Sequence, residues 1–199
     1  MNNQNNRGTV KVVNGRYRPE GKFHIAYPNT PIYDENNKLM GVTNPRDLTH
    51  IHSYGGEAIF FESLKDGKLL GTQCNNPDCE HTGNIAIPFK IHCPDCLGKN
   101  TVIDLTKKAY ESATVHTFMI TERTGAFNTL EKPIRFINIE FEGVDTILMS
   151  YMSVGEPEIG MKVVPIFKTV DPTFTILDMS WVPKGTADDQ LPEGFSFSE

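Results

Sequence analysis

Four cysteines stand in two close pairs, and their spacing is the feature that most constrains how this chain folds. Cys74 and Cys79 form the first pair, Cys93 and Cys96 form the second, and the sequence contains no further cysteine. Two close pairs, separated by a segment long enough to fold back as a hairpin, are typical of a tetrahedral four-thiolate metal site. The spacing therefore predicts structural Zn²⁺ bound by all four thiolates, which supplies folding free energy and leaves no cysteine for catalysis.

Two histidines, His81 and His92, flank the predicted site, so a mixed cysteine and histidine site is the alternative. Structural zinc is nearly always four-coordinate, and four thiolates already complete the tetrahedron. We therefore expect neither histidine to bind the metal. The second pair, Cys93-Pro94-Asp95-Cys96, predicts a tight turn whose backbone amides donate to the sulfurs. The first pair contains two more residues, which predicts a wider turn.

The N-terminal residues do not resemble an export signal. The first ten lack the basic stretch and apolar run of a secretory signal, and no apolar stretch in the sequence approaches membrane-spanning length. We therefore expect a cytoplasmic protein. Closely paired cysteines in a reducing compartment are more often metal ligands than disulfides, which agrees with the predicted site.

The first half of the chain predicts an arm followed by a metal ribbon. Residues 1–52 are rich in Asn, Pro, Gly and Thr but carry scattered apolar side chains, so we expect an extended arm that wraps around a partner. Helical spacing of apolar residues predicts a short helix over Tyr54–Lys65, with Ser53 as its cap and Gly67 at its end. Residues 53–105 are thus predicted to form this helix and a rubredoxin-like zinc ribbon.

The second half reads as short strands separated by turn signals, which predicts a mainly β protein. Five strands suit a small closed barrel of the OB-fold type, predicted over 106–183. Residues 184–199 are predicted to form a loose acidic tail. The expected strands are Ala113–Ile120, Ile134–Phe141, Thr146–Tyr151, Met161–Lys168 and Phe174–Trp181.

Charge is distributed unevenly along the sequence. Residues 1–24 contain five basic residues and one acidic residue, a net charge of +4, whereas the whole chain carries −6 and the remainder therefore −10. The arm is basic and the body is acidic. Because non-specific nucleic-acid affinity comes mainly from neutralising phosphates, the acidic body argues against a nucleic-acid-binding protein. A solvated arm and an arm that docks on a partner or touches a phosphorylated cofactor both remain open.

Several segments resemble a known family, the zinc-ribbon and OB-fold proteins that associate with acyl-CoA enzymes. The resemblance covers about 54–183. It rests on the segments 59–74, 87–89, 93–98, 133–143, 159–163 and 181–183, which include Cys93-Pro94-Asp95-Cys96-Leu97-Gly98. The family includes the zinc-finger subunit of the terminal thiolase of anaerobic toluene degradation, although no motif here selects an aromatic acyl substrate. Phe89-Lys90 replaces the proline and arginine usually expected after the central proline of the ribbon.

The resemblance implies a non-catalytic subunit that forms a hetero-oligomer with a thiolase-like catalytic subunit. In such a complex the partner supplies the nucleophile and the base, while this chain helps to bind or position a coenzyme A thioester. Four basic residues are candidates for contact with the coenzyme A phosphates, each with ordinary surface charge as the alternative: Lys65, Lys68, Lys90 and Arg123. We name no catalytic residue.

Three other functions are weighed against this one. OB barrels and zinc ribbons occur in nucleic-acid-binding proteins, although the acidic body disfavours that reading. Four cysteinates around iron would instead make a rubredoxin-like electron carrier, although the wider first pair departs from the two tight turns of such centres. A self-sufficient enzyme has little support, because the sequence lacks the GxSxG, HExxH and GxxxxGK[ST] motifs and has no spare cysteine.

Overall fold

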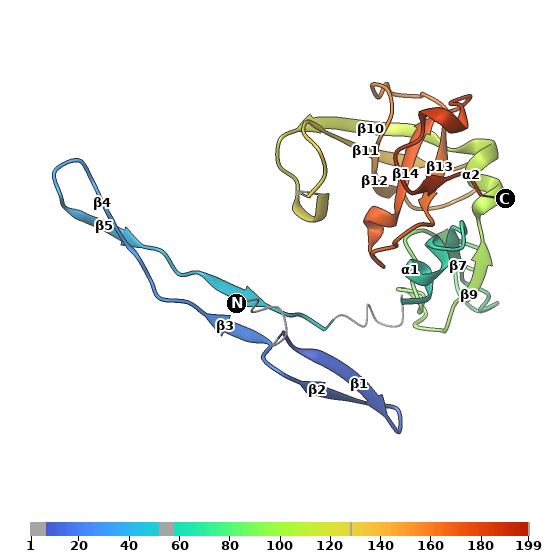
Figure 1. The fold of residues 1–199 in the computed structure, drawn as a ribbon. Coiled ribbons are helices and arrows are strands. Elements are labelled where there is room, and N and C mark those ends of the chain that lie inside the picture. The colour runs from blue at the N-terminus through green and yellow to red at the C-terminus, as the bar shows by residue number, and fades with distance from the viewer. Residues whose placement is uncertain (1–6, 52–57, 128, 199) are drawn as a thin grey trace. The chain divides into compact units, whose positions relative to one another are not determined.

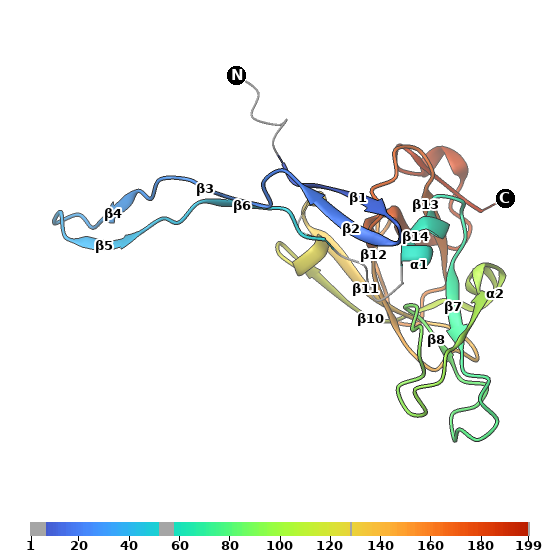
Figure 2. The same cartoon turned by 90° about the horizontal axis from the view of Figure 1, so that it is seen from below.

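The computed structural model describes residues 7–51, 58–127 and 129–198, and the chain divides into two compact units. Unit 1 is residues 1–52 and unit 2 is residues 53–199. Figures 1 and 2 show the elements of both units. Within the described residues, no helix is long and apolar enough to cross a membrane.

Unit 1 consists of antiparallel two-stranded ribbons. β1 (Thr9–Val13) pairs with β2 (Arg16–Glu20) across Asn14-Gly15, where both residues have a positive φ, as a tight hairpin turn requires. A longer ribbon follows, in which an outer pair of strands leads to an inner pair. The outer pair is β3 (His24–Ala26) with β6 (Arg46–Leu48), and the inner pair is β4 (Pro31–Tyr33) with β5 (Leu39–Val42).

Unit 2 begins with a helix and a small sheet that carries the cysteines. Helix α1 (Ala58–Leu64) ends close to Gly67, whose positive φ agrees with the predicted stop. The predicted cap, Ser53, lies outside the described residues. The sheet has the order β8-β7-β9, and its strands are β7 (Leu70–Gln73), β8 (Ile85–Ala86) and β9 (Thr101–Asp104). A second helix, α2 (Thr106–Ser112), was not foreseen and connects this sheet to the barrel.

The predicted OB-type architecture is confirmed. Among the described residues, five strands follow the order β10-β11-β12-β14-β13, and β12 and β14 are parallel. The amide of Val115 donates to Met161 O (2.9 Å) and that of Val163 donates to Ala113 O (3.2 Å), so β10 meets the start of β13 and the barrel closes. The strands are β10 (Thr114–Thr121), β11 (Ile134–Glu140), β12 (Leu148–Met152), β13 (Val163–Lys168) and β14 (Met179–Pro183).

The fifth barrel strand begins later than Phe174, where it was expected. The buried carboxylate of Asp178 accepts hydrogen bonds from the amides of Thr173 (2.8 Å) and Phe174 (2.6 Å), which holds the preceding residues in a turn. A short 3-10 helix, Ile176–Asp178, leads from this turn into β14. Another 3-10 turn, Gly125–Phe127, lies in the loop between β10 and β11.

The metal-ribbon segment and the barrel share one hydrophobic core. Phe60, Ile87 and Phe89 from the ribbon segment belong to the same buried cluster as Ile139 and Trp181 from the barrel. Polar contacts reinforce this packing. The Thr146 hydroxyl, just before β12, accepts from Ile87 N (2.7 Å) and donates to Ile87 O (2.6 Å). The carboxylate of Asp145 accepts from Ile85 N (2.7 Å), so a second hydrogen bond joins the loop between β11 and β12 to the ribbon.

The C-terminal segment, expected as a loose tail over 184–199, lies against the barrel from residue 191 onward. Leu191, Phe195 and Phe197 pack on a buried cluster of β13 and β14 residues. Strand β15 (Phe195–Ser196) pairs with β13, and Ser198 N donates to the Tyr110 hydroxyl (2.8 Å). A 3-10 turn, Asp188–Gln190, precedes this segment. The apolar side chains of the C-terminal segment explain why it packs on the barrel. The acidic residues of the same segment led to the prediction of a loose tail.

The Thr146 contact yields a prediction about stability. Thr146→Val keeps the shape of the side chain but leaves the Ile87 amide and carbonyl without their partner, so we expect the free energy of unfolding to fall by about 1–3 kcal/mol. Urea denaturation of the zinc-loaded protein measures this change. Thr82→Val, at an exposed turn position, is the control and should change stability by less than about 0.5 kcal/mol. Equal effects of the two substitutions would contradict the role given to Thr146.

Candidate metal centre

The four cysteines come together as the sequence predicts. Their sulfur atoms all lie within 4.8 Å of one another, and two of the distances, Cys74 to Cys96 and Cys79 to Cys93, are 3.9 Å. A tetrahedron with metal–sulfur bonds of about 2.3 Å has sulfur–sulfur edges of about 3.8 Å. The cluster thus has the size that Zn²⁺ requires, and the four thiolates together could bind a metal ion such as zinc.

Turns at the end of the small sheet position each pair. Cys74 follows β7 directly, and its backbone pairs with the returning chain through Cys74 N to Asn84 O (3.1 Å) and Gly83 N to Cys74 O (2.6 Å). Gly83 has a positive φ, which suits the turn before β8. In the second pair, Cys93 N donates to Gly98 O (2.9 Å) and Cys93 O accepts from Leu97 N (3.0 Å), which closes a tight turn.

Backbone amides stabilise negative charge on three of the sulfurs. In each case the amide two residues further along the chain donates to the sulfur. These pairs are Asn76 to Cys74, His81 to Cys79 and Gly98 to Cys96. The wider first turn therefore supplies an amide to each of its two sulfurs, and the tight second turn supplies one to Cys96. Such contacts orient thiolate ligands around a metal and spread their charge.

The sulfurs differ in how readily they ionise. The Asn76 side chain and the Gly98 amide lower the pKa of Cys96 to about 6. The His81 amide lowers the pKa of Cys79, but burial and the three neighbouring sulfurs outweigh it and raise that pKa to about 12. The Asn76 amide likewise lowers the pKa of Cys74, which burial and neighbouring sulfurs raise overall. Burial of several sulfurs together therefore opposes ionisation, and a divalent cation would remove this penalty.

Neither flanking histidine joins the cluster in the described part of the chain. His81 Nε2 lies 3.6 Å from Asp95 Oδ2, and its Nδ1 lies 3.1 Å from Asn84 Nδ2. His92 is exposed and pairs through its backbone with Lys99. Among the described residues, the four cysteines are the side chains that lie close enough together to bind one metal ion. This arrangement agrees with a closed structural site rather than a catalytic one, which keeps an open position.

The four basic residues named for coenzyme A do not line a single cavity. Lys68 lines an open cavity of about 540 Å³ beside α2. Lys90 lines a separate cavity of about 200 Å³ next to Cys74 and Cys93. Lys65 pairs with Asp66 at 3.0 Å, and Arg123 lies in the loop between β10 and β11. The four side chains therefore do not form one common site on this chain.

Lys107 is a basic residue that the sequence reading missed. It lines the same cavity as Lys68, together with Asp104, Thr106, Tyr110 and Ser198. Helix α2 positions Lys107, and this helix went unrecognised because its seven residues are too few to show an apolar period. The Asp104 carboxylate accepts from the amide (2.9 Å) and hydroxyl (2.6 Å) of Thr106. Two lysines and one carboxylate therefore line this open cavity, and Lys107 also lies 3.7 Å from Glu111.

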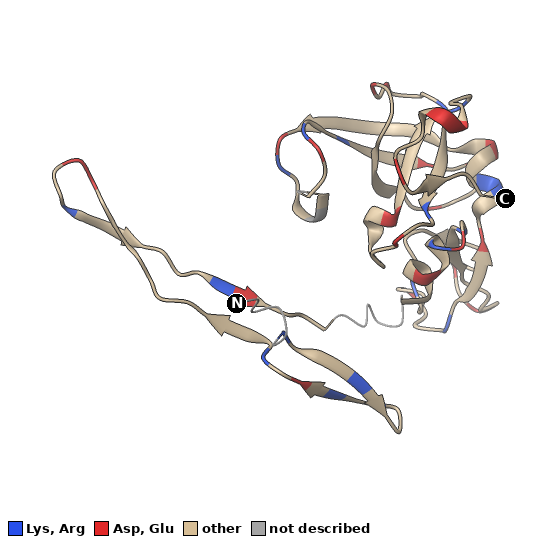
Figure 3. Cartoon of the chain, in the orientation of Figure 1, with Lys and Arg blue, Asp and Glu red and all other residues tan. Residues whose placement is uncertain are grey.

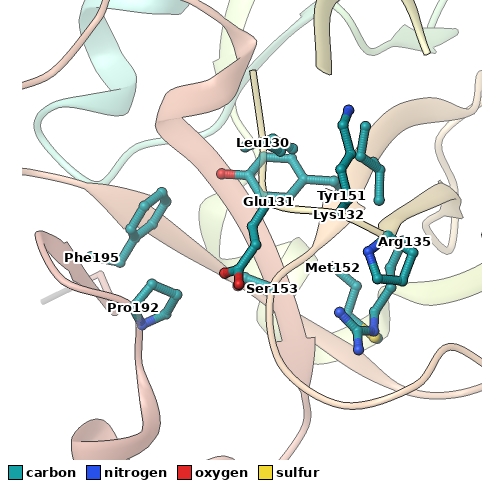
Figure 4. Close-up of a pocket in the computed structure, with 11 residues that line it drawn as sticks. Leu130, Glu131, Lys132, Arg135, Tyr151, Met152, Ser153, Pro192 and Phe195 are labelled. Atoms are coloured by element: carbon teal, nitrogen blue, oxygen red, sulfur yellow. The ribbon is translucent and has the colours of Figure 1, made fainter. Parts of the chain in front are cut away.

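A further cavity, of about 400 Å³, lies at the end of the barrel (Figure 4). Its walls come from the loop before β11, the end of β12 and the C-terminal segment, represented by Leu130, Met152 and Phe195. Arg135 on its rim is held by Glu156 through two hydrogen bonds (2.9 and 2.6 Å). No sequence motif pointed to this cavity, because its walls come from three separate segments.

Comparisons with known proteins give a limited match. No family model matches the chain, and no curated protein matches it. One similar solved structure is a DUF35 family protein of unknown function from Sulfolobus solfataricus. It is 26% identical over 57% of this chain and 81% of that chain, with a TM-score of 0.43.

The cluster predicts the effect of losing one ligand. Cys93→Ser removes a buried thiolate, so we expect the variant to lose its bound metal and to unfold at a lower temperature, because structural metal binding is largely folding free energy. Metal analysis of the purified protein and thermal denaturation measure both effects. Pro94→Ala, an exposed change in the same turn, is the control and should retain one metal ion per chain. Unchanged metal content in the serine variant would refute the four-cysteine site.

Proposed function

We propose that this chain is a non-catalytic, zinc-bound accessory subunit of a thiolase or related acyl-CoA enzyme, and that it helps to hold a coenzyme A thioester. The observation that carries the proposal is the four-cysteine cluster on a ribbon that shares one core with an OB-type barrel. This is the order of modules that the family resemblance implies for 54–183. The cluster uses all four cysteines of the sequence, which leaves none as a nucleophile.

The division of labour follows from what each subunit would contribute. A thiolase supplies its own nucleophilic cysteine and general base, so its accessory subunit has only to position a long and flexible cofactor. Pre-organised positioning lowers the entropic cost of bringing reactants together. A closed metal site and a shared core give this chain a rigid surface for that task. Zn²⁺ would act here through structure, held by Cys74, Cys79, Cys93 and Cys96.

The cavity beside α2 is the best candidate on this chain for a coenzyme A phosphate. Lys68 and Lys107 both line it, and ammonium groups bind phosphate as strong charge-assisted donors. Lys107 also lies 3.7 Å from Glu111 on the same helix, whereas Lys65 is held closer to its carboxylate, 3.0 Å from Asp66. Lys90 and Arg123 lie elsewhere, so within this proposal they would meet other parts of the cofactor or the partner.

This assignment predicts a selective loss of coenzyme A affinity. The double variant Lys68→Ala with Lys107→Ala removes both ammonium groups, so we expect the Kd of the assembled complex for coenzyme A to rise about tenfold. Isothermal titration with coenzyme A, and with dephospho-coenzyme A as comparison, measures the effect. Lys99→Ala, at an exposed lysine that does not line this cavity, is the matched control and should change the Kd less than twofold. Equal losses in the control and the double variant would contradict a local phosphate site.

The accessory role itself is tested by identifying the bound partner. Affinity purification of the tagged chain from its native cells at mild salt, followed by mass spectrometry, should recover a thiolase-like or acyl-CoA-condensing subunit in a fixed ratio. The isolated chain should show no acyl-transfer turnover. Turnover by the chain alone, or recovery of nucleic acid or redox enzymes in place of an acyl-CoA enzyme, would overturn the proposal.

A further inference from the structure

Unit 1 leaves many large apolar side chains exposed. Among them are Val12, Tyr17, Ile32, Tyr33, Leu39 and Met40, and Val12 and Tyr17 are 64% and 57% exposed. Two-stranded ribbons have no interior in which to bury such groups, and an isolated hairpin is marginally stable in water. A contiguous exposed apolar surface on a folded ribbon is typical of an interaction site. The apolar side chains of the unit 1 ribbons are therefore exposed to solvent, although their composition favours burial against another surface.

The hairpin β1–β2 separates its side chains onto two faces. Residues that pair directly across antiparallel strands lie on the same face, and consecutive residues alternate between faces. Val12 pairs with Tyr17 and Val10 pairs with Pro19, so these four form an apolar face. The opposite face is cationic, because Lys11 pairs with Arg18 and Val13 pairs with Arg16. Figure 3 shows basic residues on both strands of this hairpin.

The cationic face is poorly compensated within the hairpin. Lys11 stands directly opposite Arg18, and like charges in that position are destabilising. Among the described residues of β1 and β2, Glu20 is the one carboxylate, and it pairs with Lys11 at 2.9 Å. Arg16 and Arg18 form no ion pair with Glu20 or with another described carboxylate. An acidic surface would therefore stabilise this face, just as an apolar surface would stabilise the opposite one.

We propose that hairpin β1–β2 inserts into a groove of a folded protein partner, with an apolar wall against Val12 and Tyr17 and an acidic wall against Lys11, Arg16 and Arg18 on the opposite face. The identity of the partner, the acyl-CoA catalytic subunit, rests on the proposed function. An aromatic side chain on one face and basic side chains on the other are residue types that carry affinity and electrostatic steering at protein interfaces.

Two other occupants are outcomes that the test separates from this one. The body outside residues 1–24 carries −10, so a second copy of this chain is an acidic alternative. Nucleic acid would satisfy the cationic face, but it offers no apolar surface for Val12 and the flanking Val10 and Pro19. The apolar face therefore favours a protein partner over a polyanion.

The test measures binding of the full-length, zinc-loaded chain to the purified catalytic subunit at two salt concentrations. Val12→Thr with Tyr17→Thr keeps strand propensity but removes the apolar centre, so we expect the Kd to rise at least tenfold. Lys11→Thr with Arg18→Thr should slow association and flatten its salt dependence. Val170→Thr, an exposed position in unit 2, is the matched control and should bind like the wild type. Metal content and the thermal transition of each variant check that unit 2 remains folded.

The outcomes distinguish failure of the docking inference from failure of the proposed function. If the wild type binds the catalytic subunit and both hairpin variants bind equally well, the docking inference is wrong and the proposed function stands. If the wild type does not bind that subunit, the proposed function fails and the docking inference falls with it. Light scattering of the chain alone should show a monomer. A dimer that the Val12 and Tyr17 changes dissociate, or salt-sensitive retention on RNA that the Lys11 and Arg18 changes abolish, would overturn the protein partner proposed here.

Discussion

The arrangement of unit 2 depends on bringing four cysteine sulfurs into one tetrahedron-sized cluster. Two turns separated by a short sheet supply these sulfurs, and amides two residues along the chain donate to three of them. Without a cation, burial and mutual proximity oppose ionisation of the thiols, as the raised pKa of Cys79 shows. A bound divalent metal would offset this penalty and add folding free energy to that of the hydrophobic core.

The metal ribbon is joined to the barrel at Ile87 by two kinds of contact, one apolar and one polar. Ile87 is buried in the common core, and its backbone is held by the Thr146 hydroxyl on the barrel side. The metal ribbon and the barrel therefore fold as one unit and not as two independent domains joined by a linker. A rigid two-module surface would suit the positioning role proposed for this chain, because binding energy would not be spent on ordering the modules.

Local spacing predicted some features well and non-local contacts concealed others. The metal ligands, the end of α1 near Gly67 and the strand-rich barrel all follow from short-range patterns. The turn before β14 depends on the Asp178 carboxylate and the packing of the C-terminal segment depends on Phe195, and both contacts are set by tertiary structure. Asn14-Gly15 was a readable hairpin signal, but the low apolar periodicity of residues 1–52 obscured it. Of the candidate basic residues, Lys68 lines a cavity together with Lys107 of the same chain, which lies on the unforeseen helix α2.

X-ray absorption spectroscopy of the protein as purified tests the central claim of a four-thiolate zinc site most directly. The metal edge identifies the element, and the first coordination shell gives the ligand type, number and distance. The account predicts zinc with four sulfur neighbours at about 2.3 Å and no nitrogen or oxygen ligand. An iron edge would favour an electron carrier, and a shell containing imidazole nitrogen would remove one of the cysteines from the site; either result would contradict the structural centre described for this chain.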